Sequence, residues 1–328
     1  MKFLHSKRFL LIFALANIFV STSVASQNNN TLSITDDRNV TVEVPAKPQR
    51  IAAISYLAVD VGLALGIKPV ATTYMIPGRD PDFLGGLTKN IKKIGQRARP
   101  NLELLSETKP DTIIAIKRYT AANAEQLQKI APYVAYNMEL LNGSYKEVAE
   151  VAKIMGYPER GKQLNEEFKQ HLANYLTKVS KDKHPSFVIM WAGSYSAFHD
   201  EQTAASIMTA LGGKNIMGSM PVNGRFTSNI SLETLLEKNP DIIIVLEWLV
   251  DDKGNTVRTH EDNPIWKQLS AVKNGRVIYA GDEWSEANGP IAREILLKES
   301  AHYLYPEIFP KIDVKAEALK MIPVELHK

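Results

Sequence analysis

The chain has 328 residues, of which 45% are hydrophobic and 23% charged, a composition that fits one large or two ordinary globular domains and excludes a disordered or fibrous chain. Three of its 39 Lys and Arg residues lie in the first 26 residues, where no Asp or Glu occurs, so the other 36 basic residues balance 36 acidic ones. That balance argues against a nucleic-acid binder, and the lack of cysteine excludes a disulfide scaffold, a thiolate metal site and a lipidated Cys anchor.

The first residues follow the order of a secretory signal peptide. Basic residues within positions 2–8 precede an apolar run at 9–20, and small residues follow. The run is shorter than the roughly 20 residues that a membrane-spanning helix needs. We therefore expect residues 1–25 to be a cleaved signal peptide, and the rest to be a periplasmic protein of Gram-negative type with no membrane anchor. Free secretion is the alternative.

The predicted elements then alternate between strands and helices. Residues 32–44 alternate apolar and polar side chains around a turn at 37–39, which predicts a hairpin. A strand at 51–54, a helix at 57–65 and a strand at 70–74 follow. This β-α-β order favours parallel sheets flanked by helices.

An internal repeat indicates two lobes of like architecture. Leu102–Ile114 and Leu232–Ile244 are identical at eight of thirteen positions, at a constant offset of 130. Each copy predicts a short helix, a Pro-Asp turn and a buried strand. Chance likeness between two helix–strand units is the alternative.

A long helix is predicted between the two copies. Pro158 suits a helix start, and apolar residues recur on one helical face through residues 158–182. The fold class is therefore α/β, with two Rossmann-like lobes of parallel sheet at 26–157 and 183–328. One long backbone helix joins them, and the ligand cleft lies between the lobes.

Motifs typical of nucleotide-binding proteins and of the commonest hydrolases are absent. The sequence has no GxGxxG, Walker A, HExxH or GxSxG pattern. The six histidines beyond the signal segment are never paired at i, i+2 or i, i+4, which gives no support for an imidazole metal site. His199, just past a predicted strand, is the one candidate metal ligand among them. An exported enzyme remains a remote alternative.

Arginine, lysine and aromatic residues follow the predicted strands. In an open parallel sheet, ligands bind beyond the carboxyl ends of the strands. Guanidinium groups bind carboxylates in pairs and rings cover an apolar body, so this set predicts an anionic, bulky ligand. The candidate ligand-binding residues are Tyr56, Arg97, Lys117, Arg118, Tyr119, Trp191, Tyr195, Arg225, Trp248 and Trp284. The alternative is that the aromatic residues cap the core of each lobe.

Several segments resemble one family of binding proteins. They are Pro48–Ile51, Gly95–Glu103, Lys109–Ile114, Ile130–Pro132, Asn263–Trp266 and Trp284–Ala292. Over essentially the whole mature chain, the sequence resembles the periplasmic substrate-binding proteins of iron-siderophore ABC importers, the two-lobed class with a helical backbone. The stretch at 95–103 is most similar to the ferric-citrate-binding branch.

The resemblance implies a monomeric receptor for an Fe(III)-siderophore complex, with no covalent cofactor, that delivers its ligand to an inner-membrane ABC permease dimer. Catecholate binders of this family complete the iron coordination with Tyr and His, but the corresponding stretches here, 221–225 and 282–285, contain neither. That departure favours a carboxylate or hydroxamate siderophore, such as ferric citrate, whose iron needs no protein ligand.

The alternatives within the same fold are receptors for haem, a corrinoid or an oxyanion. Haem would need an axial ligand, for which Tyr56, Tyr119, Tyr195 or His199 is available.

The resemblance also implies a docking role for one glutamate in each lobe. Glu103 and Glu233 occupy the same place in the two repeat copies, each two residues beyond a predicted N-cap. Receptors of this family present such a pair to arginines of the permease. Glu107 and Glu237 are the nearby alternatives, and a favourable interaction with the helix dipole is the purely structural explanation.

Overall fold

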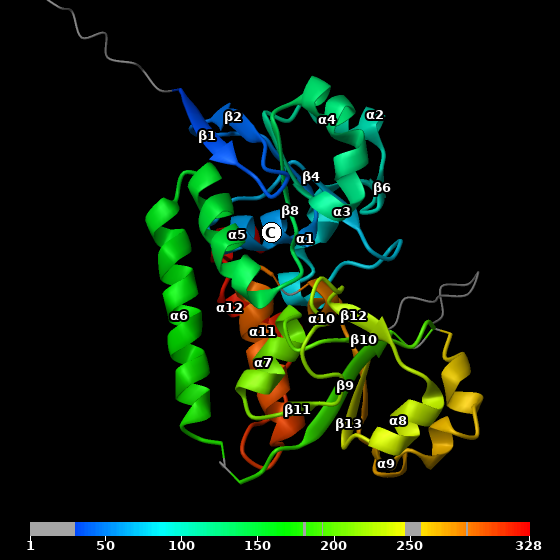
Figure 1. The fold of residues 1–328 in the computed structure, drawn as a ribbon. Coiled ribbons are helices and arrows are strands. Elements are labelled where there is room, and N and C mark those ends of the chain that lie inside the picture. The colour runs from blue at the N-terminus through cyan, green and yellow to red at the C-terminus, as the bar shows by residue number, and fades with distance from the viewer. Residues whose placement is uncertain (1–29, 180–181, 192, 247–256, 287) are drawn as a thin grey trace, which may run out of the picture.

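The computed structural model describes residues 30–179, 182–191, 193–246, 257–286 and 288–328. They form two lobes, each built around its own sheet, and a long helix runs along one side of the molecule (Figure 1). The predicted signal segment lies outside the described residues. Of the helices in those ranges, none has both the length and the apolar character to cross a membrane.

The N-terminal lobe is a sheet with helices on both faces. Its elements are β3 (Ile51–Ile54), α1 (Tyr56–Ala64), β4 (Ala71–Tyr74), η1 (Asp82–Leu84), η2 (Leu87–Asn90), β5 (Lys92–Gln96), β6 (Arg99–Pro100), α2 (Leu102–Glu107), β7 (Thr112–Ile116), α3 (Lys117–Thr120), η3 (Ala121–Asn123), α4 (Ala124–Ile130), β8 (Tyr133–Tyr136) and α5 (Leu141–Ile154). The strand order is β6-β5-β4-β3-β7-β8, and all neighbours are parallel except β5 and β6. Every residue of β3 and β7 is buried, as expected for parallel strands covered on both faces.

The predicted hairpin is confirmed as a separate two-stranded sheet. Strands β1 (Thr31–Thr35) and β2 (Thr41–Pro45) pair antiparallel, and residues 36–40 connect them.

The C-terminal lobe repeats the arrangement with a mixed sheet. After the connecting helix α6 (Pro158–Leu176) come β9 (Ser186–Trp191), β10 (Ser196–Phe198), α7 (Thr203–Ala210), β11 (Lys214–Asn215), β12 (Thr227–Asn229), α8 (Leu232–Lys238), β13 (Ile242–Leu246), η4 (Thr259–Asp262), η5 (Trp266–Gln268), α9 (Ser270–Lys273), β14 (Val277–Ala280), α10 (Glu283–Glu286), α11 (Pro290–Leu304), α12 (Val314–Lys320) and η6 (Val324–Leu326). The order is β12-β10-β9-β13-β14, with β11 also beside β9. Strands β9, β13 and β14 are parallel, whereas β10 and β12 run antiparallel to their neighbours. The α/β fold of two lobes is therefore confirmed.

The internal repeat corresponds to one helix–strand unit in each lobe. The α2–β7 unit has Asn101 as its N-cap, and the α8–β13 unit has Ser231, each with a side-chain oxygen that accepts a backbone N–H of the first turn. The aspartates of the two Pro-Asp turns also correspond. Asp111 accepts the N–H of Arg50 just before β3, and Asp241 accepts the N–H of Ser186 in β9.

The connecting helix is shorter than predicted. It ends at Leu176, whereas the sequence pattern suggested residue 182. The hydroxyl of Thr177 donates to the carbonyl of Asn174 (2.8 Å), and such side-chain bonds compete with helix continuation. Phe168 is fully buried in the core that the two lobes share.

Helix α11 is capped by a residue from the other lobe. Asp60, on α1, is buried, and its carboxylate accepts the backbone N–H groups of Ile291 (2.8 Å) and Ala292 (2.9 Å). Burial raises the pKa of Asp60 to about 7. The last helix, α12, also packs against η1 of the N-terminal lobe. The chain thus returns to its first lobe after completing the second sheet.

Replacing Asp60 by Ala is expected to lower the free energy of unfolding by about 2–4 kcal/mol, because two buried N–H groups lose their acceptor. The matched control is Asp313→Ala, which removes an exposed N-cap of α12 that accepts one N–H, from Ala316. We expect the control to cost about 1 kcal/mol or less. Urea unfolding of both variants measures the difference, and equal losses would contradict the role of burial.

Candidate functional site

A pocket of about 840 Å³ lies between the lobes, at the carboxyl ends of strands from both sheets. Pockets for small molecules usually measure roughly 300–1,000 Å³. Its lining residues are Arg97, Arg118, Tyr119, Met138, Glu139, Leu140, Trp191, Gly193, Ser194, Phe198, Gln202, Met220, Gly224, Arg225, Phe226, Thr227, Leu246 and Ser285. This is the place where the strand-end rule predicts a ligand.

Arg97 reaches the pocket from the tight turn between β5 and β6. Gly95 adopts φ +103°, and a Cβ at that position would lie 3.1 Å from the carbonyl oxygen of Arg99, so the turn favours glycine there. The backbone N–H of Arg97 donates to the carbonyl of Tyr74 (3.0 Å). Its side chain is buried, and burial lowers the pKa of Arg97 to about 10. The guanidinium therefore remains charged at neutral pH.

Arg118 and Tyr119 enter from α3, which begins directly after β7. The guanidinium carbon of Arg118 lies 4.7 Å from the centroid of the Tyr119 ring, and that of Arg97 lies 5.6 Å from it. One ring thus contacts two cations at distances typical of cation–π interactions. Arg118 also forms an ion pair with Glu139, the one carboxylate among the described lining residues.

Aromatic side chains form the wall that the C-terminal lobe contributes. Phe198 packs edge-on against Trp191, with ring centroids 6.1 Å apart, and lies 6.0 Å from Phe226. Arg225 precedes Phe226, is exposed, and follows a turn closed by the N–H of Gly224 and the carbonyl of Pro221. Together these residues give the second lobe an apolar wall with a cation at its rim.

The two walls are close to each other. The guanidinium carbon of Arg118 lies 5.9 Å from the Phe226 ring, so an arginine of one lobe contacts an aromatic ring of the other. The lobes are also joined by an ion pair between Arg79 and the buried Asp282. Burial raises the pKa of Asp282. A cleft with three arginines, aromatic faces and one carboxylate is suited to an anionic ligand of moderate size.

Five predicted residues come together in this pocket: Arg97, Arg118, Tyr119, Trp191 and Arg225. Trp248 lies outside the described residues. The other four lie elsewhere, which corrects our expectation for them.

Lys117 and Tyr56 are occupied by structural contacts. The Lys117 ammonium donates to the backbone carbonyl of Asp37 (2.6 Å) in the β1–β2 connection. Tyr56 is buried, packs edge-on against Phe83 at 5.8 Å between centroids, and its hydroxyl accepts the N–H of Met75.

Tyr195 and Trp284 pack against hydrophobic clusters, Tyr195 as a half-buried and Trp284 as a fully buried residue. Tyr195 packs against the apolar cluster on the outer face of the second sheet. Trp284 is fully buried, and its indole N–H donates to Glu299 (2.9 Å). The strand-end rule locates a residue along the chain but not the face to which its side chain turns. On α10 it is Ser285, the next residue, that lines the pocket.

His199 is a core histidine. It is buried, and its ring nitrogens lie within hydrogen-bond distance of the Gly218 carbonyl (3.2 Å) and the Ser228 hydroxyl (2.8 Å). The expectation that it serves as a metal ligand therefore has no support from its contacts.

The largest omission of the sequence analysis is the segment after β8. Met138, Glu139 and Leu140 all line the pocket. The sequence does indicate a strand before this segment: an apolar run at 133–136 follows Pro132 and ends at Asn137. The same strand-end rule, applied to this run, identifies the segment.

Comparison with known proteins identifies relatives of this chain. Among curated relatives, the chain is 27% identical over 316 residues to the probable siderophore-binding lipoprotein YfiY of Bacillus subtilis, covering 90% of this chain and 96% of YfiY. It is 26% identical over 265 residues to the Fe(3+) dicitrate-binding periplasmic protein FecB of Escherichia coli, covering 79% and 85%. It is 28% identical over 199 residues to the haem uptake protein IsdE of Staphylococcus aureus, covering 58% and 66%.

A solved structure and a family model complete the comparison. The complex of Staphylococcus aureus SirA with staphyloferrin B matches with a TM-score of 0.67 and 25% identity, covering 84% of this chain and 98% of SirA. Residues 51–283 match the family model of periplasmic binding proteins. The chain therefore belongs to the periplasmic binding protein family.

Proposed function

We propose that this protein is an extracytoplasmic receptor that binds an anionic ferric siderophore of carboxylate or hydroxamate type, such as ferric citrate, and delivers it to an ABC importer. The observation that carries the proposal is the convergence of Arg97, Arg118 and Arg225, from both lobes, on one cleft with an aromatic wall. The names of FecB and YfiY support the same ligand class.

The chemistry of the ligand fits such a cleft. In a carboxylate or hydroxamate chelate, oxygen atoms of the chelator surround the ferric ion and leave an anionic outer surface. Arginine forks bind such oxygens in pairs, and Trp191 and Phe226 offer faces to the carbon skeleton. The receptor then holds the outer surface of the chelate, and iron travels as cargo without a protein ligand or a covalent cofactor.

The remaining details are part of the same proposal. We infer a monomeric, non-enzymatic receptor in the periplasm of a Gram-negative cell, released there after removal of residues 1–25. Its partner is a two-fold permease, which Glu103 and Glu233 contact. Both glutamates are exposed in the first turn of equivalent helices, α2 and α8, which supports a duplicated contact surface.

Binding of ferric citrate is expected to quench the intrinsic fluorescence saturably, because Trp191 lies in the cleft wall, with a dissociation constant below roughly 10 μM. Iron-free citrate is expected to quench weakly. Trp191→Phe is the control: it should lose most of the quenching while calorimetry still detects binding. If neither ferric citrate nor a ferric trihydroxamate binds in that range, the siderophore proposal fails.

Haem is the second candidate, because IsdE is a haem uptake protein and Tyr119 and Met138 line the cleft. Both residue types serve as axial haem ligands. Adding haem to the same protein distinguishes the candidates. If haem binds with micromolar affinity and its absorption band shifts, while ferric chelates give no response, the ligand is haem and not a siderophore.

A further inference from the structure

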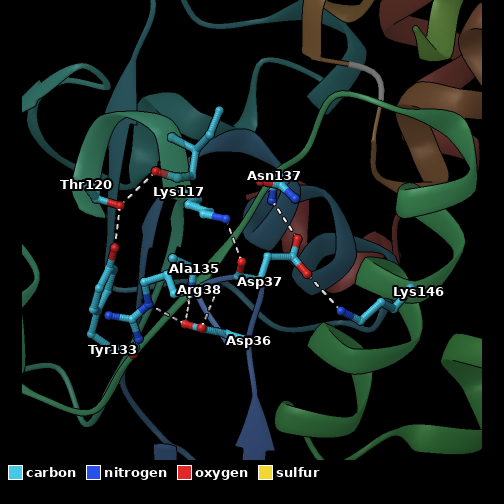
Figure 2. Close-up of polar contacts among 10 residues, drawn as sticks. Asp36, Asp37, Arg38, Lys117, Thr120, Tyr133, Ala135, Asn137 and Lys146 are labelled. Atoms are coloured by element: carbon cyan, nitrogen blue, oxygen red, sulfur yellow. Dashed lines mark hydrogen bonds and ion pairs between the residues drawn. The ribbon is translucent and has the colours of Figure 1, made fainter. Parts of the chain in front are cut away.

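The connection between β1 and β2, residues 36–40, makes polar contacts with β8, α3 and α5 of the N-terminal lobe (Figure 2). Asp36 anchors it to the edge strand of the N-terminal sheet. Its carboxylate accepts the N–H of Ala135 in β8 (2.8 Å) and pairs with Arg38, whose guanidinium donates to the carbonyl of Tyr133. Asp36 therefore holds the connection to β8 and to its own turn.

Asp37, the next residue, makes contacts of a different kind. Its backbone carbonyl accepts the Lys117 ammonium (2.6 Å), one carboxylate oxygen accepts the N–H of Asn137 (2.8 Å), and the other accepts the Lys146 ammonium (2.8 Å). Figure 2 shows these three partners surrounding Asp37. They come from α3, from the segment after β8 and from α5, so one residue joins three parts of the lobe.

Two of the three partners adjoin the cleft residues that form an ion pair. Lys117 immediately precedes Arg118, and Asn137 lies two residues before Glu139. Arg118 and Glu139 pair with each other in the cleft. The contacts therefore form a closed ring, in which the Asp37 backbone carbonyl holds the Lys117 side chain and the Asp37 carboxylate holds the backbone N–H of Asn137.

The segment 137–140 needs such support. Met138 has φ +58°, which is unfavourable for a residue with a side chain. Its N–H donates to Glu147 (3.0 Å), and its carbonyl accepts the side-chain amide of Asn288 from the C-terminal lobe. The segment is thus fixed beyond Asn137 by α5 and the second lobe, and at Asn137 by Asp37.

We propose that Asp37 is a positioning residue that sets the Arg118–Glu139 pair for ligand binding, without touching the ligand. The proposal rests on the proposed function, because it assigns a part in ligand affinity to a residue outside the cleft. Loss of the Asp37 carboxylate contacts frees the segment after β8 at Asn137, and Glu139 then pairs with Arg118 in the cleft only after this segment is ordered again.

The test compares two isosteric variants of adjacent residues, Asp37→Asn and Asp36→Asn. In each, the amide keeps one acceptor oxygen and turns an NH₂ group toward a donor. Asp37→Asn is expected to weaken binding of ferric citrate about tenfold. Asp36→Asn is expected to lower the melting temperature by at least as much as Asp37→Asn does. It should leave the affinity for ferric citrate within about twofold of that of the unchanged protein. Equal affinity losses in the two variants would reduce Asp37 to an ordinary structural residue.

A double-mutant cycle separates positioning from general destabilisation. If Asp37 acts through Arg118, the affinity loss caused by Asp37→Asn should largely disappear in an Arg118→Gln background. A loss of the same size in both backgrounds would overturn the proposal.

Hydrogen exchange of the ligand-free protein gives a readout that needs no ligand. Amides in 137–140 are expected to exchange about tenfold faster in Asp37→Asn than in Asp36→Asn, because the carboxylate contact to the Asn137 N–H is the one that the variant changes. Unchanged exchange in this segment would contradict positioning, whatever the ligand. If the unchanged protein fails to bind ferric citrate, that ligand is wrong, and the exchange experiment still decides the role of Asp37.

Discussion

With Arg118 and Arg225 both replaced by glutamine, the affinity for ferric citrate is expected to fall by at least about a hundredfold. Each arginine can form charge-assisted hydrogen bonds with an anionic chelate, worth roughly 1.5–3 kcal/mol where the cleft excludes water. Both side chains line the cleft, one from each lobe, so a bound chelate can engage them together. Calorimetric titration measures the loss, and thermal unfolding checks that the fold is retained.

Arg97 is kept in that variant for a physical reason. It is buried beside Tyr119, so its removal would change the packing of the cleft as well as its charge. Arg160→Gln is the matched control, because it removes one positive charge from α6, outside the cleft. An affinity that survives the double change, or falls equally in the control, would mean that the ligand binds elsewhere.

Much of the fold could be predicted from the sequence, because the patterns that indicate its helices and strands lie within short segments. Alternation of apolar residues around residues 37–39 is sufficient for the hairpin, and the repeat at 102–114 and 232–244 predicts both helix–strand units. The return of α12 to the N-terminal lobe could not be predicted in this way. Its position depends on packing against η1, more than 200 residues earlier in the chain, and no periodicity within a segment reports such a contact.

The candidate site was predictable where a side chain follows a strand and faces the cleft, as in Arg97, Arg118 and Trp191. It was not predictable where tertiary contacts decide the direction of the side chain. Lys117 is adjacent to Arg118 and chemically similar, yet it binds the backbone of Asp37 because the β1–β2 connection packs behind α3. Trp284 likewise turns into the core, where Glu299 accepts its indole N–H.

A second large effect is expected at the surface that we propose contacts the transporter. Glu103 and Glu233 are exposed, follow equivalent N-caps, and lie one in each lobe. Hydrogen bonds from its own backbone N–H and from Ser231 lower the pKa of Glu233, so this carboxylate is charged at physiological pH. Charges at a docking surface mainly set orientation and encounter rate, and a two-fold partner needs one contact from each lobe.

Replacing Glu103 and Glu233 together by alanine is expected to abolish receptor-dependent iron uptake into cells while the affinity for ferric citrate in solution stays unchanged. Each single variant should retain part of the uptake, since one contact remains. Glu107→Ala with Glu237→Ala is the matched control on the same two helices, and it should transport normally. Radioactive iron uptake measures the effect. Normal uptake by the first double variant would leave Glu103 and Glu233 with only a favourable interaction at the helix N-termini. Uptake lost in the control alone would instead assign the docking contact to Glu107 and Glu237, one helical turn further along the same helices.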